Sequence, residues 1–341
     1  MKGNVLTGIR PTGALHLGHY VGALKQWIPL QDDYECFFLV ADVQALTTHA
    51  DNPQLIQDSV KQVILDFIAV GLDPYRKNVH FVLQSAIPEL TELTVYLSMV
   101  TPFSWMESNP TIKSEKETLL SQNKSVTTGF MYYPVSQAAD ILFVSPDPSF
   151  STQPILVPVG EDQIPHLRGT NNIAKAFNRI YGDCFVMCEP LVGEIGRLVG
   201  TNGKEKMSKS LDNAIFLGDS PEKIQKLVKN MFTDPKRIHA NDPGTVEGNP
   251  VFIYHDAFNQ NKDEVEDLKI RYRLGKVGDI EVKDKLNIAI QNFLSPIRER
   301  RIQAESEDLN SIVEKGTKDA KNLANETLER TRRLMHINYK L

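Results

Sequence analysis

The sequence contains few cysteines and no long apolar segment. Only three of its 341 residues are cysteine, namely Cys36, Cys184 and Cys188. An odd number, with only two of them near each other, argues against a disulfide framework and is typical of a reducing compartment. No further cysteine or nearby histidine completes a tetrahedral metal site with Cys184 and Cys188, so we expect buried thiols. No apolar run approaches the roughly 18 residues needed to cross a bilayer.

The sequence also lacks a recognisable targeting segment and an excess of basic residues. It opens with MKGNVLTGIRPTG, in which no basic stretch precedes an apolar one, so we expect a cytoplasmic protein without a membrane anchor. The formal net charge of −5 argues against a general nucleic-acid binder but leaves room for a local basic face. With 41% hydrophobic and 24% charged residues, the composition is that of a globular protein with a substantial core.

Short apolar runs alternate with helical patterns in the first part of the chain. Runs of strand length cover Val5–Ile9, Cys36–Val40 and Val79–Leu83, whereas apolar spacing predicts helices over Leu17–Leu30 and Pro53–Val70. This alternation predicts an α/β fold with a Rossmann-like, doubly wound parallel sheet. Ligands of such sheets bind beyond the carboxyl ends of the strands, so we expect the loops after these strands to surround one crevice.

The pattern changes after about residue 211. The last predicted strand covers 155–159, and beyond residue 211 helical patterns dominate to the C-terminus. We therefore expect two domains, a Rossmann-type catalytic domain over 1–211 and a mainly α-helical region over 212–341. The last helix is a candidate for packing back on the first domain. The predicted helices of the second region cover 222–232, 262–274, 284–293 and 310–336.

The first chemically informative motif is PTGALHLGHY, over Pro11–Tyr20. It follows a predicted strand and opens a predicted helix, whose free N–H groups and positive dipole end favour an anion. His16 and His19 are three residues apart and project to the same side at a helix start. Two imidazole donors there can stabilise charge on a phosphoryl group in its transition state. The alternative is two ordinary histidines near a helix start.

The second motif is KMSKS, over 206–210, in a glycine-bearing stretch that we interpret as a mobile loop. Lys206 and Lys209 can wrap a polyphosphate as flexible point charges. If they grip the leaving pyrophosphate more tightly in the transition state, they raise the rate as well as the affinity. The alternative is a solvated charged loop.

The two motifs in this order, on a parallel α/β pattern, resemble class I aminoacyl-tRNA synthetases. More narrowly, the chain resembles the bacterial-type tryptophanyl-tRNA synthetases, and the similarity extends to the final helix. That resemblance implies an enzyme, a tryptophan-tRNA ligase, which uses ATP to convert L-tryptophan to tryptophanyl-AMP and transfers it to tRNA(Trp) in translation. The segments that carry the resemblance are GIRPTGALHLGHYVGAL, ADVQALTT, QSAIPELTEL, YPVSQAADIL, VPVGEDQ and KMSKSLDNAIFL.

The resemblance also implies roles for single residues. His16, His19, Lys206 and Lys209 match catalytic positions, and Asp140 matches the acidic residue that accepts the indole N–H. Gln137 and Gln163 match further positions of the tryptophan site. The positions that match ATP contacts are Arg10, Pro11, Thr12, Gly18, His19, Lys113, Gly160, Glu161, Asp162, Leu198, Lys206, Met207, Ser208, Lys209 and Ser210.

A carboxylate in an otherwise apolar pocket suits tryptophan, whose ring offers one donor and no acceptor. Sites built on such a bond reject an analogue without the donor by roughly 10⁴–10⁵-fold. Without the resemblance, however, a helix N-cap is the favoured interpretation of Asp140, because short acidic residues favour caps. Some residues depart from the family's usual choice: Arg10 where many members have glutamine, Gln137 where many have methionine, and Gln44 in place of a frequent histidine.

The resemblance further implies Mg²⁺, a homodimer and binding of the tRNA anticodon by the helical region. We find no dedicated carboxylate cage and predict no protein metal ligands, since Mg²⁺ commonly binds mostly through phosphate and water. Arginines in the last predicted helices could contact RNA phosphates. The alternative is pairing with the interleaved glutamates. These arginines are Arg298, Arg300, Arg301, Arg330, Arg332 and Arg333.

Three other functions compete with this prediction. A nucleotidylyltransferase also uses the first motif but has no need for KMSKS two hundred residues later. A tyrosyl-tRNA synthetase must recognise a hydroxyl group, and its first motif differs from GIRPTG. A non-catalytic, tryptophan-binding paralogue is the third alternative, but both motifs retain their charged residues here.

Overall fold

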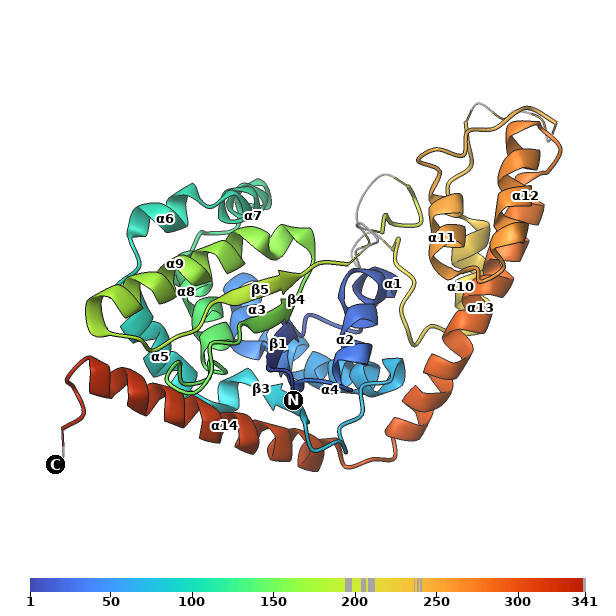
Figure 1. The fold of residues 1–341 in the computed structure, drawn as a ribbon. Helices are drawn as coiled ribbons and strands as arrows, with labels where there is room; N and C mark the ends of the chain where they lie inside the picture. The colour runs from blue at the N-terminus through green and yellow to red at the C-terminus, as the bar shows by residue number, and fades with distance from the viewer. Residues whose placement is uncertain are drawn as a thin grey trace.

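The computed structural model describes residues 1–193, 198–203, 207, 212–235, 237, 239 and 241–339. These residues form a parallel α/β domain, from which a helical region projects to one side (Figure 1). The predicted fold class, a Rossmann-like parallel sheet followed by a mainly helical C-terminal region, is confirmed. Among the described helices, none is both long and apolar enough to cross a membrane.

The sheet has five parallel strands in the order β3-β2-β1-β4-β5. The chain fills the sheet outward from β1 to β3 and then returns to place β4 on the other side of β1. This change of direction is the topological switch point at which doubly wound sheets bind ligands. The strands are β1 (Asn4–Ile9), β2 (Glu35–Val40), β3 (Val79–Leu83), β4 (Ile155–Pro158) and β5 (Cys188–Leu191).

Successive side chains of the central strands point to opposite faces, and each face is buried by its own helices. Val5 and Phe38 belong to one apolar cluster, and their neighbours Leu6 and Phe37 belong to the other. Trp27 stacks on Phe38 with a ring-centroid distance of 5.4 Å. The first cluster is completed by α2 (Lys25–Leu30), α4 (Pro53–Val70) and α13 (Asp279–Ala304). The second is completed by α5 (Pro88–Ser98), α8 (Thr128–Leu142), α9 (Ile164–Tyr181) and α14 (Leu309–Leu334).

The last helix, α14, covers the edge of the sheet along β3. Gly316 allows the close approach, since a Cβ at this position would lie 2.4 Å from the carbonyl oxygen of Phe81. One residue further on, the Thr317 hydroxyl accepts a hydrogen bond of 3.0 Å from the Leu83 N–H. The edge strand is therefore shielded by a helix, which prevents pairing with another chain.

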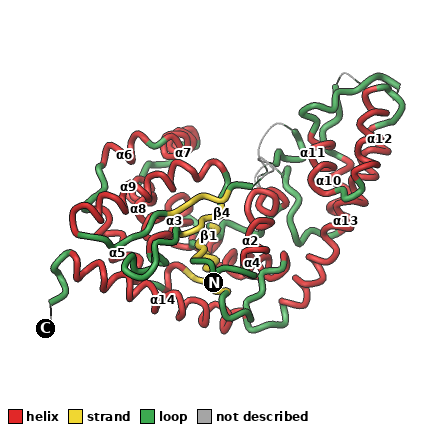
Figure 2. The backbone as a smooth tube through the Cα atoms, in the orientation of Figure 1, coloured by secondary structure: helices red, strands yellow, loops and turns green. Residues whose placement is uncertain are grey.

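The helical region contains α10 (Pro221–Lys229), α11 (Pro250–Phe258) and α12 (Lys262–Arg273), together with the first half of α13. Helix α13 packs on α10 and α11 at one end and on α4 at the other, so it connects the two parts of the molecule. Figure 2 shows it as one continuous helix that descends from α12 towards α4. The predicted domain boundary at residue 211 adjoins the undescribed residues 208–211, and the two-domain division stays a prediction.

Candidate active site

The first motif lies where β1 ends, at the switch point of the sheet. The predicted single helix is observed as three joined segments: α1 (Leu17–His19), a π-helical turn over Tyr20–Leu24, and α2 (Lys25–Leu30). The His16 and His19 rings lie side by side, with centroids 3.8 Å apart. The His16 N–H donates to Nδ1 of His19 at 3.2 Å, which fixes the orientation of that ring. Both rings are half-buried at a helix start, where an anion is favoured.

The segment after the second motif pairs with the first motif, although the two are about two hundred residues apart in the chain. The Leu17 N–H donates to the Ile215 carbonyl and the Leu217 N–H donates to the Leu15 carbonyl, each at 2.9 Å. The backbone of His16 thus forms an antiparallel bridge with that of Phe216. This pairing holds the chain downstream of KMSKS against the first motif.

Met207, the described residue of KMSKS, also lies against the first motif. Its Sδ is 3.3 Å from the position that a Cβ on Gly18 would occupy, so the glycine makes room for this contact. Met207 and the predicted adenine contact Leu198 are both buried in the apolar cluster that contains Leu15. The other predicted residues of this loop lie outside the described part of the chain; they are Lys206, Ser208, Lys209 and Ser210.

Asp140 lies near the end of α8. Its side chain is buried in the protein, and it lies in the last turn of the helix and not at its start, so the alternative of a helix N-cap is wrong. The Gln84 side-chain amide donates to both carboxylate oxygens, at 3.0 and 2.8 Å, and the Gln44 amide donates to Oδ2 at 2.5 Å. Burial raises the pKa of Asp140 to about 7, and the hydrogen bonds from the two glutamines partly oppose this rise. Asp140 is therefore a buried acceptor whose pKa lies close to neutral pH.

Gln137 connects the α8 residues to the loop after β4. It precedes Asp140 by one helical turn, and its amide donates to Oε1 of Gln163 at 3.1 Å. Gln163 in turn donates to Asp162 at 2.7 Å. Gly160 leads into the short 3₁₀ helix that contains Glu161. Gln137 and Gln163, two of the predicted tryptophan residues, therefore form one hydrogen-bonded group with Asp162 of the predicted ribose loop.

Helix α7 (Pro110–Ser121) contacts both the loop after β4 and the loop of the first motif. The Thr111 hydroxyl donates to the Asp162 carbonyl at 3.2 Å. Glu115 pairs with Arg10 across 3.6 Å, and so links α7 to the loop of the first motif. Lys113, the predicted additional phosphate contact, is exposed on this helix. In that loop Thr12 is half-buried, and its N–H donates to the carbonyl of Arg10.

Several residues of this site were not predicted from the sequence. Tyr133 donates to Glu115 at 2.9 Å and also contacts Nε2 of the buried His166 at 3.2 Å. Burial lowers the pKa of His166 to about 4, so this imidazole is neutral at ordinary pH. Gln84 is another, since it holds Asp140. Gln84 and Tyr133 belong to segments that carry the resemblance, but their contacts with Asp140, Glu115 and His166 join distant parts of the sequence, and only the fold brings them together.

The C-terminal arginines are mostly engaged within the protein. Arg300 donates to the Ala69 carbonyl, Arg301 pairs with Asp66, and Arg330 donates to the carbonyls of Cys184 and Ser145. Arg332 pairs with Glu92 and Glu329. These contacts occupy four of the six arginines within the protein, although among these four only Arg332 pairs with an interleaved glutamate, Glu329. Arg298 and Arg333 stay candidates for RNA contacts.

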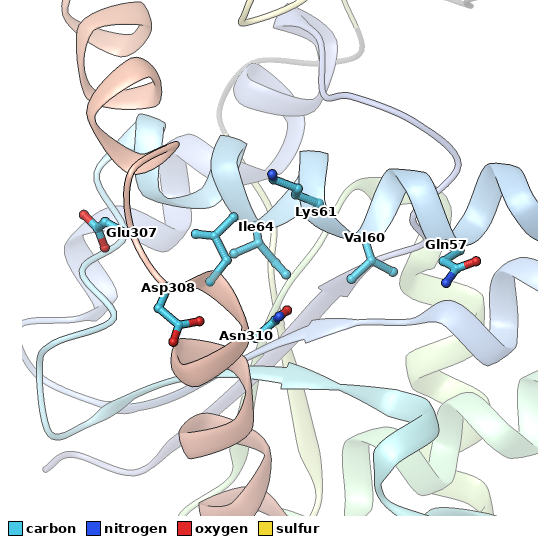
Figure 3. Close-up of a pocket in the computed structure, with 8 residues that line it drawn as sticks. Gln57, Val60, Lys61, Ile64, Glu307, Asp308 and Asn310 are labelled. Carbon is cyan, nitrogen blue, oxygen red and sulfur yellow. The ribbon is translucent and has the colours of Figure 1, made fainter.

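A separate pocket of about 320 Å³ lies between α4 and the turn from α13 to α14 (Figure 3). Its lining mixes Lys61 with Glu307 and Asp308, beside the apolar Val60 and Ile64. None of the predicted site residues borders it. Within the described part of the chain, no three histidine, cysteine or acidic side chains converge in a way that could hold a metal ion.

Comparison with known proteins gives a consistent assignment across the chain. The family model described as "tRNA synthetases class I (W and Y)" matches residues 2–295. The tryptophan–tRNA ligase of Chlamydia caviae is 43% identical over 345 residues, covering 99% of this chain and 97% of the relative. That of Clostridium longisporum is 45% identical over 344 residues, covering 98% and 97%.

Solved structures give the same result. The tryptophanyl-tRNA synthetase of Campylobacter jejuni, complexed with ADP and tryptophan, superimposes with a TM-score of 0.81 at 31% identity. The match covers 98% of this chain and 99% of that chain. The similarity therefore includes the helical region as well as the sheet.

Proposed function

Because the chain belongs to the class I tRNA synthetases for tryptophan and tyrosine, and its relatives are tryptophan–tRNA ligases, we propose that it activates tryptophan with ATP and transfers it to tRNA(Trp). The chain is thus an enzyme, an aminoacyl-tRNA synthetase of the tryptophan type. The observation that carries the proposal is the convergence of the first motif, the segment around the second motif and the Asp140 group on one end of the sheet. This arrangement supports a phosphate-binding role for the first motif and an acceptor role for Asp140 at the same end of the sheet.

In the first step, the tryptophan carboxylate attacks the α-phosphate of ATP and pyrophosphate leaves. His16 and His19 donate hydrogen bonds to the α-phosphoryl oxygens as charge builds on them. Their adjacent rings at a helix start support this role. Lys206 and Lys209 hold the β- and γ-phosphates. The position of Met207, the residue next to Lys206 in the chain, against Gly18 of the first motif supports this role. A ribose hydroxyl of the tRNA's 3′-terminal adenosine then attacks the carbonyl carbon of tryptophanyl-AMP, an ester forms and AMP leaves.

Residues around the triphosphate complete the ATP site. Arg10, Pro11, Thr12 and Gly18 supply the first loop, and Lys113 reaches the phosphates from α7. Gly160, Glu161 and Asp162 face the ribose, and Leu198 contacts adenine. Mg²⁺ bound to the triphosphate and water would neutralise charge on the phosphates; the described residues offer no cage of their own for it, which suits an ion delivered with its nucleotide.

Asp140 accepts the indole N–H, while Gln137 and Gln163 line the rest of the tryptophan site. Its burial supports this role, because a hydrogen bond to a carboxylate that is shielded from water is stronger than one in solvent. In the structure the Gln44 amide donates to Oδ2 of this carboxylate. We expect this amide to move when tryptophan binds.

We further propose that the helical region, residues 212–341, contacts the tRNA anticodon, and that the enzyme works in the cytoplasm as a homodimer.

The proposed dimer contact involves exposed apolar side chains. Val95 on α5 and Met99, directly after the last residue of α5, are exposed one turn apart, and Phe103 is exposed at the start of α6 (Phe103–Ser108). Such neighbouring apolar side chains suit a subunit contact. Light scattering should give twice the mass of the 38.4 kDa chain. A monomer at micromolar concentration contradicts the dimer.

Pyrophosphate exchange into ATP tests the activity directly. Purified protein should exchange labelled pyrophosphate in the presence of tryptophan and not of tyrosine or phenylalanine. Exchange that depends on tyrosine would assign the chain to the sister enzyme. Absence of exchange with every amino acid would favour a binding protein without catalysis and overturn the proposal.

The raised pKa of Asp140 predicts a pH-dependent KM for tryptophan. The pKa of Asp140 is about 7, and its charged form accepts the hydrogen bond from the indole N–H. The carboxylate therefore predominates above pH 7, and the protonated carboxyl group predominates below it. We expect the KM for tryptophan to rise roughly tenfold from pH 8 to pH 6, as the carboxylate fraction falls. Exchange kinetics at saturating ATP measure this, and the KM for ATP should stay constant. A flat tryptophan profile contradicts the assignment.

A further inference from the structure

A buried ion pair between Asp66 on α4 and Arg301 on α13 lies directly behind the first motif. Nε of Arg301 is 2.9 Å from Oδ1 of Asp66. The Asp66 side chain is 1% exposed and that of Arg301 is 15% exposed. Gln62, one turn before Asp66, accepts a hydrogen bond of 2.5 Å from Nη2 of Arg301. The guanidinium is thereby fixed in position on the surface of α4.

The carboxylate of Asp66 also holds the backbone of the first motif. Its second oxygen, Oδ2, accepts a hydrogen bond of 2.7 Å from the N–H of Leu15, the residue before His16. Both the donor and the acceptor are buried, so this charge-assisted bond is protected from water. The position of Leu15, and with it the start of the His16 backbone, therefore depends on where Asp66 lies.

Arg301 lies against the end of the segment 215–217, which pairs with the first motif. Its Nε lies 3.2 Å and its Cδ 3.4 Å from the position that a Cβ on Gly218 would occupy. Gly218 follows Leu217, which pairs with Leu15. The ion pair thus contacts the first motif through Asp66 and the chain that follows KMSKS through Arg301.

We infer that Asp66 and Arg301 are positioning residues for adenylate formation, which set the first motif and the segment beyond the second motif in register. The inference rests on the proposed function. Neither residue contacts a substrate; each acts through the backbone of Leu15 or through the segment at Gly218. Since Arg301 belongs to α13, which begins in the helical region and ends on α4, the orientation of that helix is coupled to the geometry at His16 (Figure 1).

A purely structural role for the pair is the alternative. A buried ion pair is no better for stability than well-packed apolar residues, so stability alone gives little reason for it. Catalysis, by contrast, is sensitive to small displacements of positioned groups. The two roles differ in what a substitution changes: a structural pair affects the fraction of folded enzyme, whereas a positioning pair affects the turnover of each folded molecule.

Asp66→Asn and Arg301→Lys test the inference, with Asp279→Asn as the matched control. Asp279 pairs with the buried Arg237 at 3.1 Å at the other end of α13, away from the first motif. We expect kcat for tryptophan-dependent exchange, measured per titrated active site, to fall on the order of 10- to 100-fold in Asp66→Asn. Arg301→Lys, which keeps the charge, should lose less. The KM for tryptophan should stay within about threefold of wild type in both, because the Asp140 group is untouched.

Titration of active sites removes any loss of folded protein from the comparison, and Arg301→Lys remains informative if Asp66→Asn does not fold. Equal kcat per site in wild type and Arg301→Lys, or equal losses in Asp66→Asn and Asp279→Asn, would overturn the inference and leave the proposed function intact. If wild type itself shows no tryptophan-dependent exchange, the proposed function fails and the inference fails with it.

Discussion

Asp140→Asn is expected to lower kcat/KM for tryptophan by roughly 10³- to 10⁴-fold while leaving the KM for ATP nearly unchanged. The carboxylate now accepts from Gln84 and Gln44, and we propose that the indole N–H takes the place of the Gln44 amide when tryptophan binds. An asparagine at this position offers one acceptor oxygen and adds an NH₂ group. That group would face other donors in a buried site, where unmatched polar atoms are costly.

A substrate analogue separates lost recognition from lost folding. A tryptophan analogue with sulfur in place of the ring N–H should be strongly rejected by wild type, but Asp140→Asn should discriminate far less between the two. Asp58→Asn is the matched control, since Asp58 also accepts from a glutamine amide, that of Gln54, but on the exposed surface of α4. Its kinetics should match those of wild type. Unchanged use of tryptophan by Asp140→Asn would remove this residue from the site.

Loss of either imidazole of the first motif should slow adenylate formation by about 10²- to 10³-fold, the usual effect of removing one donor to a developing charge. His16→Ala and His19→Ala should both retain a KM for tryptophan within about threefold of wild type, because the tryptophan group lies across the crevice. The measurement is single-turnover formation of tryptophanyl-AMP in a quenched-flow experiment. The double variant should be little slower than either single one, if the two adjacent, tilted rings act as a unit on the same phosphoryl group.

His336→Ala is the control for these variants, because His336 is an exposed histidine beyond the end of α14. It should form the adenylate at the wild-type rate. Adenylate formation that is unaffected in both His16→Ala and His19→Ala would contradict the transition-state role. It would leave the second motif as the source of catalysis.

The central part of the fold could be predicted because its local signals are strong. The runs at Val5–Ile9 and Cys36–Val40 are short and apolar, and each forms a strand that is one residue longer at its start. Helix α4 has the predicted bounds because Asn52 caps it, Pro53 occupies its first turn and Gly71 ends it in a left-handed conformation. Strand β5 was missed because Cys-Glu-Pro-Leu has neither an alternating nor an apolar pattern.

The site was predicted less completely than the fold. Motifs and resemblance identify His16, His19 and Asp140, but they say little about what holds each side chain. Gln84 approaches Asp140 from a different element, and Ile215 pairs with Leu17 across about two hundred residues. Contacts of this kind depend on the packing of distant segments, which leaves no periodicity or motif in the sequence.

The position of α14 has a consequence for how the protein is made. The helix that shields β3 is encoded at the very end of the chain, more than two hundred residues after the strand itself. A ribosome therefore finishes the catalytic sheet long before it releases the segment that seals its border. Until Gly316 and its neighbours emerge, the nascent sheet has an open strand at which other chains can add, and chaperone protection matters most in that interval.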